Sequence, residues 1–572
     1  MTPDGASFRQ TLGIGEAALP AENAGALLRR NASDPAIAGR PAIAYEDLVV
    51  THAEYYRECC RWANLFLSTR RPGEPLHVGI LLDNSPEYLY AFGGAALAGG
   101  AIVGVNHTRR GAQLLHDVQH THCGLVIYEP KHADLIGPVI GDLGTVLVAG
   151  DSLGEALAAE DDTDPGLEVS VETPWTLIFT SGTAAAPKAV LCSQRRILMT
   201  GNRMVQLMGL GPDDVGYVSM PLFHSNSVMV GWAPSIVAGA SVALAPKFTA
   251  SRWLADVRRY GATYFNYTGK PLAYILAQPE APDDADNPVR VSYGNEGAPQ
   301  VVAAFSERFG VEVIDGFGAT EGGLGVTRTD DAPAASVGRA GPELRIVDED
   351  GQGLPRAVFD ENVLLVDPTA CVGEIVNTSG LGVFEGYYNN DEANARATRN
   401  GWYWSGDLGY IDTEGWLYFA GRNADWIRVD GENFPARPIE VAVGRHPGVM
   451  ICVAYGVPDP EAGDRVMITL VLRPDYAFDG AEFAAWIDAQ QDMSPKWRPT
   501  HIRLSQAIPT SPTNKVLIRD LVHAKYRPDL VGDDTLWIRS RGDAAYRAFG
   551  SAEAEALLDE MREAGRERFW DL

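Results

Sequence analysis

The chain is poor in positive charge. Its 572 residues include 47 Lys and Arg against 75 Asp and Glu, which gives a formal net charge of −28. This balance excludes a general nucleic-acid binder and disfavours docking on anionic lipid, so we expect no nucleic-acid partner and at most peripheral membrane contact. Any anionic ligand must be held by local dipoles and a few cations, against the overall field.

Cysteine patterns, targeting signals and membrane spans are also lacking. The six cysteines show no Cys-x-x-Cys spacing, which predicts free thiols in a reducing cytosol and neither a zinc site nor a disulfide scaffold. The first residues lack the basic and apolar blocks of a signal peptide, so we expect a cytoplasmic protein. An uncharged run at 88–105 approaches the length of a membrane span, but its five glycines favour a buried helix, a tight turn and a strand.

No internal repeat or long low-complexity stretch interrupts the chain, which is too long for one ordinary core. Up to about residue 420, apolar runs alternate with helical patterns, and this alternation predicts parallel sheets wrapped by helices in more than one layered unit. The clearest of these runs are 77–82, 124–128, 145–148, 263–267 and 311–315. At 341–418, short strands separated by Gly, Asp, Asn and Pro turns predict a small antiparallel or barrel-like module.

We therefore predict an α/β fold in three parts. Residues 1–423 would form a large N-terminal domain of layered α/β subdomains plus the barrel-like module. Residues 424–535 would form a smaller α+β domain, after a boundary near 421–425. Residues 536–572 would be an extension that holds an amphipathic helix, because apolar residues recur at helical spacing between Ala554 and Ala564.

The most informative segment is 180–188, with the sequence TSGTAAAPK, directly after an apolar strand-like run. Backbone N–H groups and hydroxyls in such a loop can bind an anion, and Lys188 adds a positive charge, as a polyphosphate site requires. It is not a Walker A loop, because the Gly-Lys-Ser/Thr ending is missing.

Three later segments offer complementary chemistry. Residues 315–321 (DGFGATE) combine an aromatic for base stacking, a hydroxyl for a phosphate and a carboxylate for Mg²⁺, while Glu321 replaces the third glycine of a dinucleotide motif. Residues 404–409 (WSGDLG) place Asp407 in a glycine turn, where it suits ribose hydroxyls, and Arg422 could donate to the same sugar. Residues 509–515 (PTSPTNK) place Lys515 on a loop near the C-terminus.

In this order, these segments resemble the adenylate-forming superfamily, in particular its acyl-CoA synthetases. Residues 180–190, 317–321, 405–409 and 513–515 look like that family's motifs. The segments 106–110 (NHTRR), 221–226 (PLFHSN) and 428–433 (RVDGEN) resemble its fatty-acid branch, near actinobacterial and fatty-acid-transport-type ligases. The resemblance spans about residues 30–530.

The resemblance implies roles for individual residues. The catalytic group would comprise Lys515, Thr320, Glu321 and His224, with Glu321 also carrying the metal and His224 at the mouth of the acyl tunnel. Lys515 would bridge the substrate carboxylate and the α-phosphate, Phe317 would stack on adenine, and residues 294–299 would line the adenine and acyl pocket. The nucleotide and co-substrate would be held by Thr180, Ser181, Gly182, Thr183, Lys188, Asn295, Glu296, Gly297, Ala298, Pro299, Asp315, Gly316, Phe317, Gly318, Asp407, Arg422, Gly431, Glu432 and Asn433.

The resemblance also implies a reaction and its partners. A small-molecule carboxylic acid, fatty or otherwise apolar, would be activated by ATP with Mg²⁺ to an acyl-adenylate and passed to CoA. The C-terminal domain would be mobile and rotate between the two steps. The sequence leaves open the acid's identity, the choice of CoA or a carrier-protein thiol, and the oligomeric state, a homodimer included.

Departures from the family pattern keep two alternatives open. Ala184, Ala185 and Ala189 replace a Thr and two Gly of the usual phosphate loop, which stiffens it and removes a hydroxyl. A catalytically impaired acyl- or nucleotide-binding homologue is therefore one alternative. The other is a serine hydrolase or thioesterase, because residues 150–154 (GDSLG) fit the Gly-x-Ser-x-Gly elbow around Ser152.

Overall fold

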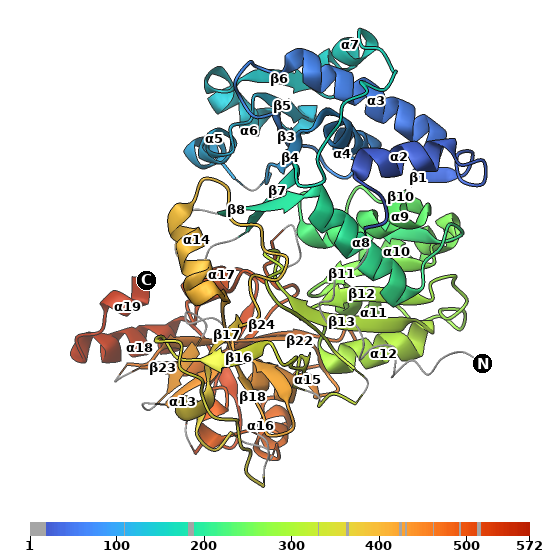
Figure 1. Ribbon diagram of the computed structural model, residues 1–572. Helices are drawn as coiled ribbons and strands as arrows, with labels where there is room; N and C mark the ends of the chain where they lie inside the picture. The colour runs from blue at the N-terminus through green and yellow to red at the C-terminus, as the bar shows by residue number, and fades with distance from the viewer. Residues whose placement is uncertain are drawn as a thin grey trace.

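The computed structural model describes residues 19–571, apart from 108, 181–187, 330, 334, 362–364, 422–425, 430–431, 461–462, 491–492, 512–515 and 541. Three layered parts follow one another along the chain in Figure 1: a blue sheet unit, a green sheet unit, and a yellow-to-red region that holds the smaller sheets. In the part of the chain so described, no helix is long and apolar enough to cross a membrane.

The first unit is a six-stranded sheet in the order β6-β5-β3-β4-β7-β8. Its strands are parallel except for the antiparallel pair β7–β8. The strands are β3 (His77–Leu81), β4 (Ala101–Gly104), β5 (Leu125–Tyr128), β6 (Thr145–Val148), β7 (Pro174–Thr180) and β8 (Lys188–Ser193). The helices are α3 (His52–Thr69), α4 (Pro86–Ala98), α5 (Gly111–His120), α6 (Ala133–Ile136) and α7 (Ser152–Ala158), with short 3₁₀ turns at Pro130–His132 and Gly137–Asp142.

The uncharged run at 88–105 forms a helix, a turn and a strand, as predicted. Helix α4 begins with Pro86 after Ser85 and is terminated by Gly99, whose φ of 70° is in the left-handed region that glycine reaches freely. Gly93 and Gly94 let α3 approach closely, because a Cβ at Gly94 would lie 2.7 Å from Cβ of Trp62. Strand β4 follows at once and is buried throughout.

The second unit is an eight-stranded sheet in the order β14-β13-β12-β11-β9-β10-β1-β2. Its strands are β1 (Pro41–Tyr45), β2 (Leu48–Thr51), β9 (Val215–Val218), β10 (Ser241–Leu244), β11 (Tyr264–Thr268), β12 (Val291–Asn295), β13 (Glu312–Gly318) and β14 (Gly325–Thr327). The helices are α2 (Ala24–Ser33), α8 (Gln194–Met208), the π-helix η3 (Asn226–Trp232), α9 (Ala233–Ala238), α10 (Ala250–Tyr260), α11 (Pro271–Leu276) and α12 (Pro299–Phe309).

The two units share one apolar core. Trp232 of η3 stacks on Phe92 of α4 with ring centroids 4.9 Å apart, and its ring centroid is 5.3 Å from that of Trp175 in β7. All three side chains are at most 1% exposed. These rings pack helices of the two units against each other and against β7.

The segment predicted as an antiparallel or barrel-like module forms a five-stranded antiparallel sheet in the order β15-β19-β18-β17-β16. The strands are β15 (Gly338–Arg339), β16 (Leu344–Val347), β17 (Gly373–Asn377), β18 (Tyr403–Ile411) and β19 (Trp416–Phe419). They are accompanied by α13 (Pro368–Cys371), α14 (Asp391–Ala397) and a 3₁₀ turn at Arg399–Gly401.

The C-terminal region contains a hairpin of β20 (Trp426–Val429) and β21 (Glu432–Pro435), and a five-stranded sheet in the order β22-β23-β24-β25-β26. That sheet's strands are β22 (Val449–Pro458), β23 (Asp464–Leu472), β24 (His501–Leu504), β25 (Thr535–Ile538) and β26 (Arg547–Phe549). The helices are α15 (Arg437–Gly444), α16 (Gly480–Asp488), α17 (Ile518–Ala524), α18 (Ser551–Glu563) and α19 (Arg568–Asp571), with a 3₁₀ turn at Pro495–Trp497.

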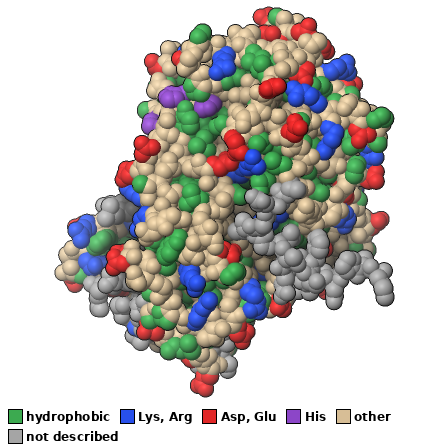
Figure 2. Space-filling model, in the orientation of Figure 1, with side chains coloured by type: hydrophobic (Ala, Val, Ile, Leu, Met, Phe, Trp, Pro, Cys, Tyr) green, Lys and Arg blue, Asp and Glu red, His purple; other side chains and the backbone are tan. Residues whose placement is uncertain are grey.

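The last helices pack on this C-terminal sheet rather than standing free. Helix α18 buries Ala554, Leu557 and Met561, as its amphipathic pattern predicts. In the face shown in Figure 2, the described Lys and Arg side chains are interspersed with Asp and Glu and form no continuous basic patch.

Candidate active site

Glu321 links the ends of two strands from different sheets. It lies in the turn after β13, and its carboxylate accepts hydrogen bonds from the hydroxyls of Thr180 (3.4 Å) and Tyr387 (3.0 Å). Thr180 is both the last residue of β7 and the first residue of the predicted phosphate loop at 180–188. The geometry therefore brings that loop's entrance to the predicted metal-binding carboxylate.

Lys188 stands at the other end of the same loop. It pairs with Thr180 in the β7–β8 ladder, and its ammonium lies 4.8 Å from the ring centroid of Tyr387. A cation over an aromatic face is attracted by the ring quadrupole. Tyr387 thus contacts both the predicted phosphate-binding cation and the predicted metal-binding carboxylate.

Thr320 joins this group to Ser225, the residue after His224. The Thr320 hydroxyl is 2.8 Å from the hydroxyl of Ser225, the neighbour of His224. The Asn226 N–H donates to Nδ1 of His224 at 3.3 Å, so a neutral ring carries its proton on Nε2. The π-helix η3 begins at Asn226, and π-helical turns occur often at functional sites.

The segment from Asn295 to Pro299 is fixed by Asp315 and Gly316. The Asn295 amide donates to the Gly316 carbonyl (2.8 Å), while Asp315 accepts from Tyr267 (2.5 Å) and from the Gly297 N–H (2.9 Å). Glu296 is exposed with φ of 65°, Ala298 is the N-cap residue of α12, and Pro299 is its first residue. The predicted adenine and acyl segment is therefore locked to β13.

Burial raises the pKa of Asp315 to about 6, against the lowering effect of its bonds to Tyr267 and Gly297. Between the unfolded pKa of 3.8 and the folded pKa of about 6, the folded protein binds the proton more strongly, so stability falls as pH rises.

We expect Asp315→Asn to remove this dependence of stability on pH. Between pH 4 and pH 7 the wild type should lose about 2 kcal/mol of unfolding free energy relative to the variant, measured by urea unfolding. Parallel pH profiles for the two proteins would contradict the assignment.

Phe317 and Asp407 approach the site from β13 and β18. The Phe317 ring lies 5.3 Å from that of Phe419 in β19, the strand paired with β18. Asp407 is 6% exposed and follows Gly406, whose φ is 74°. Burial raises the pKa of Tyr403, and the nearby negative charges of Glu321 and Asp407 raise it further.

Several predicted residues lie outside the described residues: Ser181, Gly182, Thr183, Arg422, Gly431 and Lys515. For Glu432 and Asn433 the structure describes the backbone alone, in β21, paired with Val429 and Arg428. Gly318 ends β13 and pairs with Gly325 of β14. Their roles in binding stay predictions.

Comparison with protein families matches residues 28–388 to the AMP-binding enzyme family and residues 438–515 to the AMP-binding enzyme C-terminal domain. The chain belongs to the AMP-binding enzyme family. It is 42% identical over 528 residues to the steroid-22-oyl-CoA synthetase of Rhodococcus jostii, covering 91% of this chain and 94% of that protein. It is 45% identical over 480 residues to the medium/long-chain-fatty-acid–CoA ligase FadD17 of Mycobacterium tuberculosis, covering 84% and 92%.

Solved structures agree on the fold. A structure of an anthranilate CoA ligase with anthranoyl-AMP matches with a TM-score of 0.77 at 22% identity, over 89% of this chain and 98% of that chain. The o-succinylbenzoate CoA synthetase of Bacillus subtilis, in complex with its acyl-adenylate, gives a TM-score of 0.69 at 23% identity, over 86% and 97%. The fold and the relatives together make this chain an AMP-forming acid–thiol ligase that uses ATP and CoA.

The structure gives the hydrolase alternative no support at Ser152. Its hydroxyl accepts the Val148 N–H at 2.9 Å at the start of α7, and in the described part of the chain no histidine hydrogen-bonds to it. We expect Ser152→Ala to leave ligase turnover within twofold of the wild type, in an assay of acid- and CoA-dependent AMP release. A loss beyond tenfold would reopen the hydrolase interpretation.

Oxygen donors of this AMP-binding enzyme fit a hard cation. The Glu321 carboxylate lies with the hydroxyls of Thr180 and Tyr387, and Mg²⁺ prefers oxygen ligands. A second cluster of Asp83, Glu129 and His132 brings three ligand atoms within 4.8 Å of one another. There the ammonium of Lys131, 2.6 Å from Asp83 and bonded also to Glu129, already supplies the positive charge.

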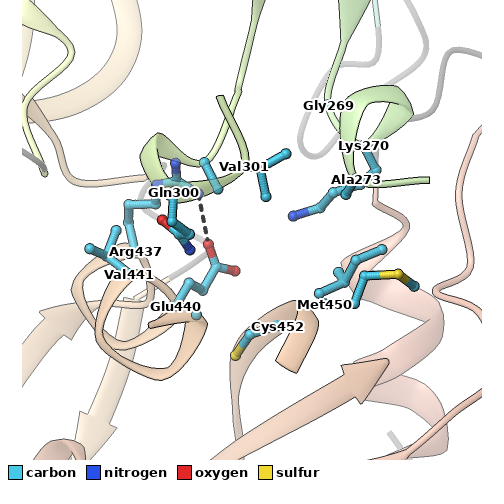
Figure 3. Close-up of a pocket in the computed structure, with 13 residues that line it drawn as sticks. Gly269, Lys270, Ala273, Gln300, Val301, Arg437, Glu440, Val441, Met450 and Cys452 are labelled. Carbon is cyan, nitrogen blue, oxygen red and sulfur yellow. Dashed lines mark hydrogen bonds and ion pairs between the residues drawn. The ribbon is translucent and has the colours of Figure 1, made fainter. Parts of the chain in front are cut away.

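A small cavity of about 30 Å³ separates α15 from the adenine and acyl segment (Figure 3). Arg437, at the start of α15, donates to the Gly297 carbonyl and lies 3.4 Å from Glu440. Lys270 points into the cavity from the opposite wall, and burial lowers its pKa. The C-terminal domain therefore contacts the very segment that Asp315 fixes.

Sequence reasoning missed the residues that join the motifs. Tyr387 bridges Lys188 and Glu321, Ser225, which follows His224 in the chain, bonds Thr320, and Arg437 contacts Gly297. Tyr387 carried a weak signal, because it follows a glycine in the turn Gly-Tyr-Tyr-Asn-Asn before an acidic helix start. Arg437 carried none, since its role depends on how two distant domains meet.

Proposed function

We propose that this ligase activates an apolar carboxylic acid, of the medium- or long-chain fatty or steroid side-chain class, in a Mg²⁺-dependent reaction. The supporting observation is the meeting of Thr180, Lys188 and Glu321 around Tyr387, which gathers a cation, hydroxyls and a carboxylate at the end of the phosphate loop. The named relatives act on a steroid-22-oyl acid and on medium- and long-chain fatty acids. We expect the enzyme to act in the cytoplasm.

The first half-reaction forms a mixed anhydride. A carboxylate oxygen of the acid attacks the α-phosphorus of ATP, the bond to the bridging oxygen breaks, and pyrophosphate leaves. Because both reactants are anionic, the site must neutralise charge that moves toward pyrophosphate. Lys188 would bind the outer phosphates, Thr320 the α-phosphate, and Lys515 would bridge the acid and the α-phosphate.

Orientation is the second contribution of the chain. Asp407 would hold the ribose, Phe317 would stack on adenine, and the segment at 295–299 would line the space between adenine and the acyl group. Holding both reactants in place makes the attack effectively unimolecular. Mg²⁺, held by Glu321, would supply further charge neutralisation at the phosphates.

The second half-reaction transfers the acyl group to CoA. The thiolate sulfur attacks the carbonyl carbon of the adenylate, the carbon–oxygen bond breaks, and AMP leaves with its negative charge. His224, near Thr320, would lie at the entrance of the acyl tunnel. The contact of Arg437 with Gly297 supports a coupling between C-terminal domain position and this site.

Light scattering of the purified protein tests the expected alternatives of monomer and homodimer.

An AMP-release screen over a panel of acids tests this proposal. The panel should contain fatty acids of increasing length, steroid side-chain acids and small aromatic acids, each with and without CoA. We expect AMP release with the apolar acids, and strong stimulation by CoA. Turnover of small aromatic acids alone would refute the substrate class, and pyrophosphate exchange without Mg²⁺ would refute the metal requirement.

A further inference from the structure

Arg196 is a buried cation in the first turn of α8. It is 2% exposed, and among the described residues no carboxylate lies within ion-pair distance of it. Arginine is almost never fully buried without a partner, because desolvating its charge is costly. Its Nε atom is also buried without a hydrogen-bond partner in the described chain. Its charge is therefore held by hydrogen bonds to neutral groups rather than by a carboxylate.

The guanidinium joins two segments of the proposed ATP site. Nη1 donates to the Leu191 carbonyl at 3.0 Å, and Nη2 donates to the Thr320 carbonyl. Leu191 lies in β8, three residues after Lys188, while Thr320 immediately precedes Glu321. One side chain thus ties the strand that carries the proposed phosphate-binding lysine to the turn that carries the proposed metal ligand.

Hydrogen bonds at the N-terminus of α8 hold the backbone of Arg196 in place. The Ser193 hydroxyl caps the helix by accepting the Arg196 N–H at 3.2 Å. Glu385 in turn accepts from the N–H (2.6 Å) and the hydroxyl (2.5 Å) of Ser193. Because the cap is held from both sides, the guanidinium has little freedom to leave the Thr320 carbonyl.

Gly322 leaves room for the guanidinium. Its φ is 69°, and a Cβ at this position would lie 2.8 Å from Nη2 of Arg196 and 2.7 Å from a methyl group of Val383. Arg196, Glu385 and Glu321 all act electrostatically on the Cys192 thiol, whose pKa burial raises to about 11. The positive charge of Arg196 therefore sits behind the turn, in the same neighbourhood as the Glu321 carboxylate.

We propose that Arg196 is a positioning residue for adenylation: it fixes the Thr320 carbonyl, and through it the orientation of the Thr320 hydroxyl and the Glu321 carboxylate relative to Lys188. The inference rests on the proposed roles of Thr320 and Glu321 in holding ATP and Mg²⁺. It adds a residue that contacts neither ligand and acts through the turn.

The test is binding of MgATP to the full-length Arg196→Met variant, measured by titration calorimetry without any acid. Methionine keeps the length and apolar packing of the side chain but removes its donors and charge. We expect the dissociation constant for MgATP to rise about 10- to 100-fold, as for other residues that orient metal ligands. The Mg²⁺ concentration for half-maximal pyrophosphate exchange should rise similarly, while thioester formation from supplied acyl-adenylate stays within twofold.

Arg195→Met is the matched control. Arg195 is the preceding residue, but its side chain is 41% exposed and pairs with Glu172 at 2.5 Å, away from the Thr320 turn. This variant should bind MgATP as the wild type does. Arg196→Lys should recover part of the loss, because it restores the charge but not the two-pronged bonding.

A double-mutant cycle with Gly322→Ala separates positioning from general destabilisation. If the added methyl group displaces Arg196 from Thr320, the double variant should bind MgATP about as weakly as either single variant. If Arg196→Met does not fold, the MgATP affinities of Arg196→Lys and Gly322→Ala are compared with that of the wild type instead. Wild-type MgATP affinity in the folded Arg196 variants, or equal loss in both half-reactions, would overturn the inference. A wild type that does not bind MgATP would refute the proposed function itself.

Discussion

Lys515→Ala strongly impairs adenylation and spares thioester formation: this is the result we expect for the most damaging single substitution. The reason is charge, because a carboxylate can approach the α-phosphate only where a cation bridges the two anions. Losing that cation should lower carboxylate-dependent pyrophosphate exchange about 10²- to 10³-fold, the usual effect of removing one charge-stabilising donor. Thioester formation from supplied acyl-adenylate needs no such bridge and should stay near the wild-type rate.

The comparison of half-reactions distinguishes catalysis from folding. Lys496→Ala is the matched control, since Lys496 is another lysine of the C-terminal region, in the 3₁₀ turn at Pro495–Trp497. It should leave both half-reactions intact. If Lys515→Ala retains pyrophosphate exchange, or loses both half-reactions equally, the role proposed for Lys515 is wrong.

Glu321→Gln should give the second-largest effect. Glutamine keeps an oxygen that can accept from Thr180 and Tyr387, so the local contacts survive while the negative charge is lost. We expect the Mg²⁺ concentration for half-maximal pyrophosphate exchange to rise at least 10-fold, with a rate loss of about 10- to 100-fold at saturating Mg²⁺. The measurement is exchange over a Mg²⁺ titration at fixed ATP.

Glu312→Gln controls for removing a carboxylate from the same strand, because Glu312 is an exposed residue at the opposite end of β13. Its Mg²⁺ titration should match that of the wild type. A Glu321→Gln titration that also matches would mean that the metal is held by other groups.

Apolar runs, helical periodicity and the turn-forming residues between them made most of the fold predictable from the sequence. The strand-like runs at 77–82 and 263–267 became β3 and β11, both in parallel pairings, because buried parallel strands read as continuous apolar runs. The glycines at 88–105 favoured a buried helix over a membrane-spanning helix, since close helix packing requires small residues. The order of the strands in the sheets was harder to predict from the sequence. No local pattern indicates that β1 lies beside β10, about 200 residues away.

The site was predictable where single segments carry their own chemistry. Thr180, Lys188 and Glu321 were predicted from the loop and the turn that hold them, and the structure brings these three together around Tyr387. Residues that act between segments were not predictable, because their meaning depends on packing. Arg196 reads in sequence as one of two adjacent helix-start arginines, and only the fold separates it from exposed Arg195.

Isotope transfer from the acid to AMP tests the central claim most directly. The acid, labelled with ¹⁸O at both carboxylate oxygens, is turned over with ATP and CoA, and the released AMP is weighed by mass spectrometry. Attack of the carboxylate on the α-phosphorus predicts one ¹⁸O atom in the phosphate of each AMP and none in pyrophosphate. Unlabelled AMP, or label in any other phosphate product, would contradict the account.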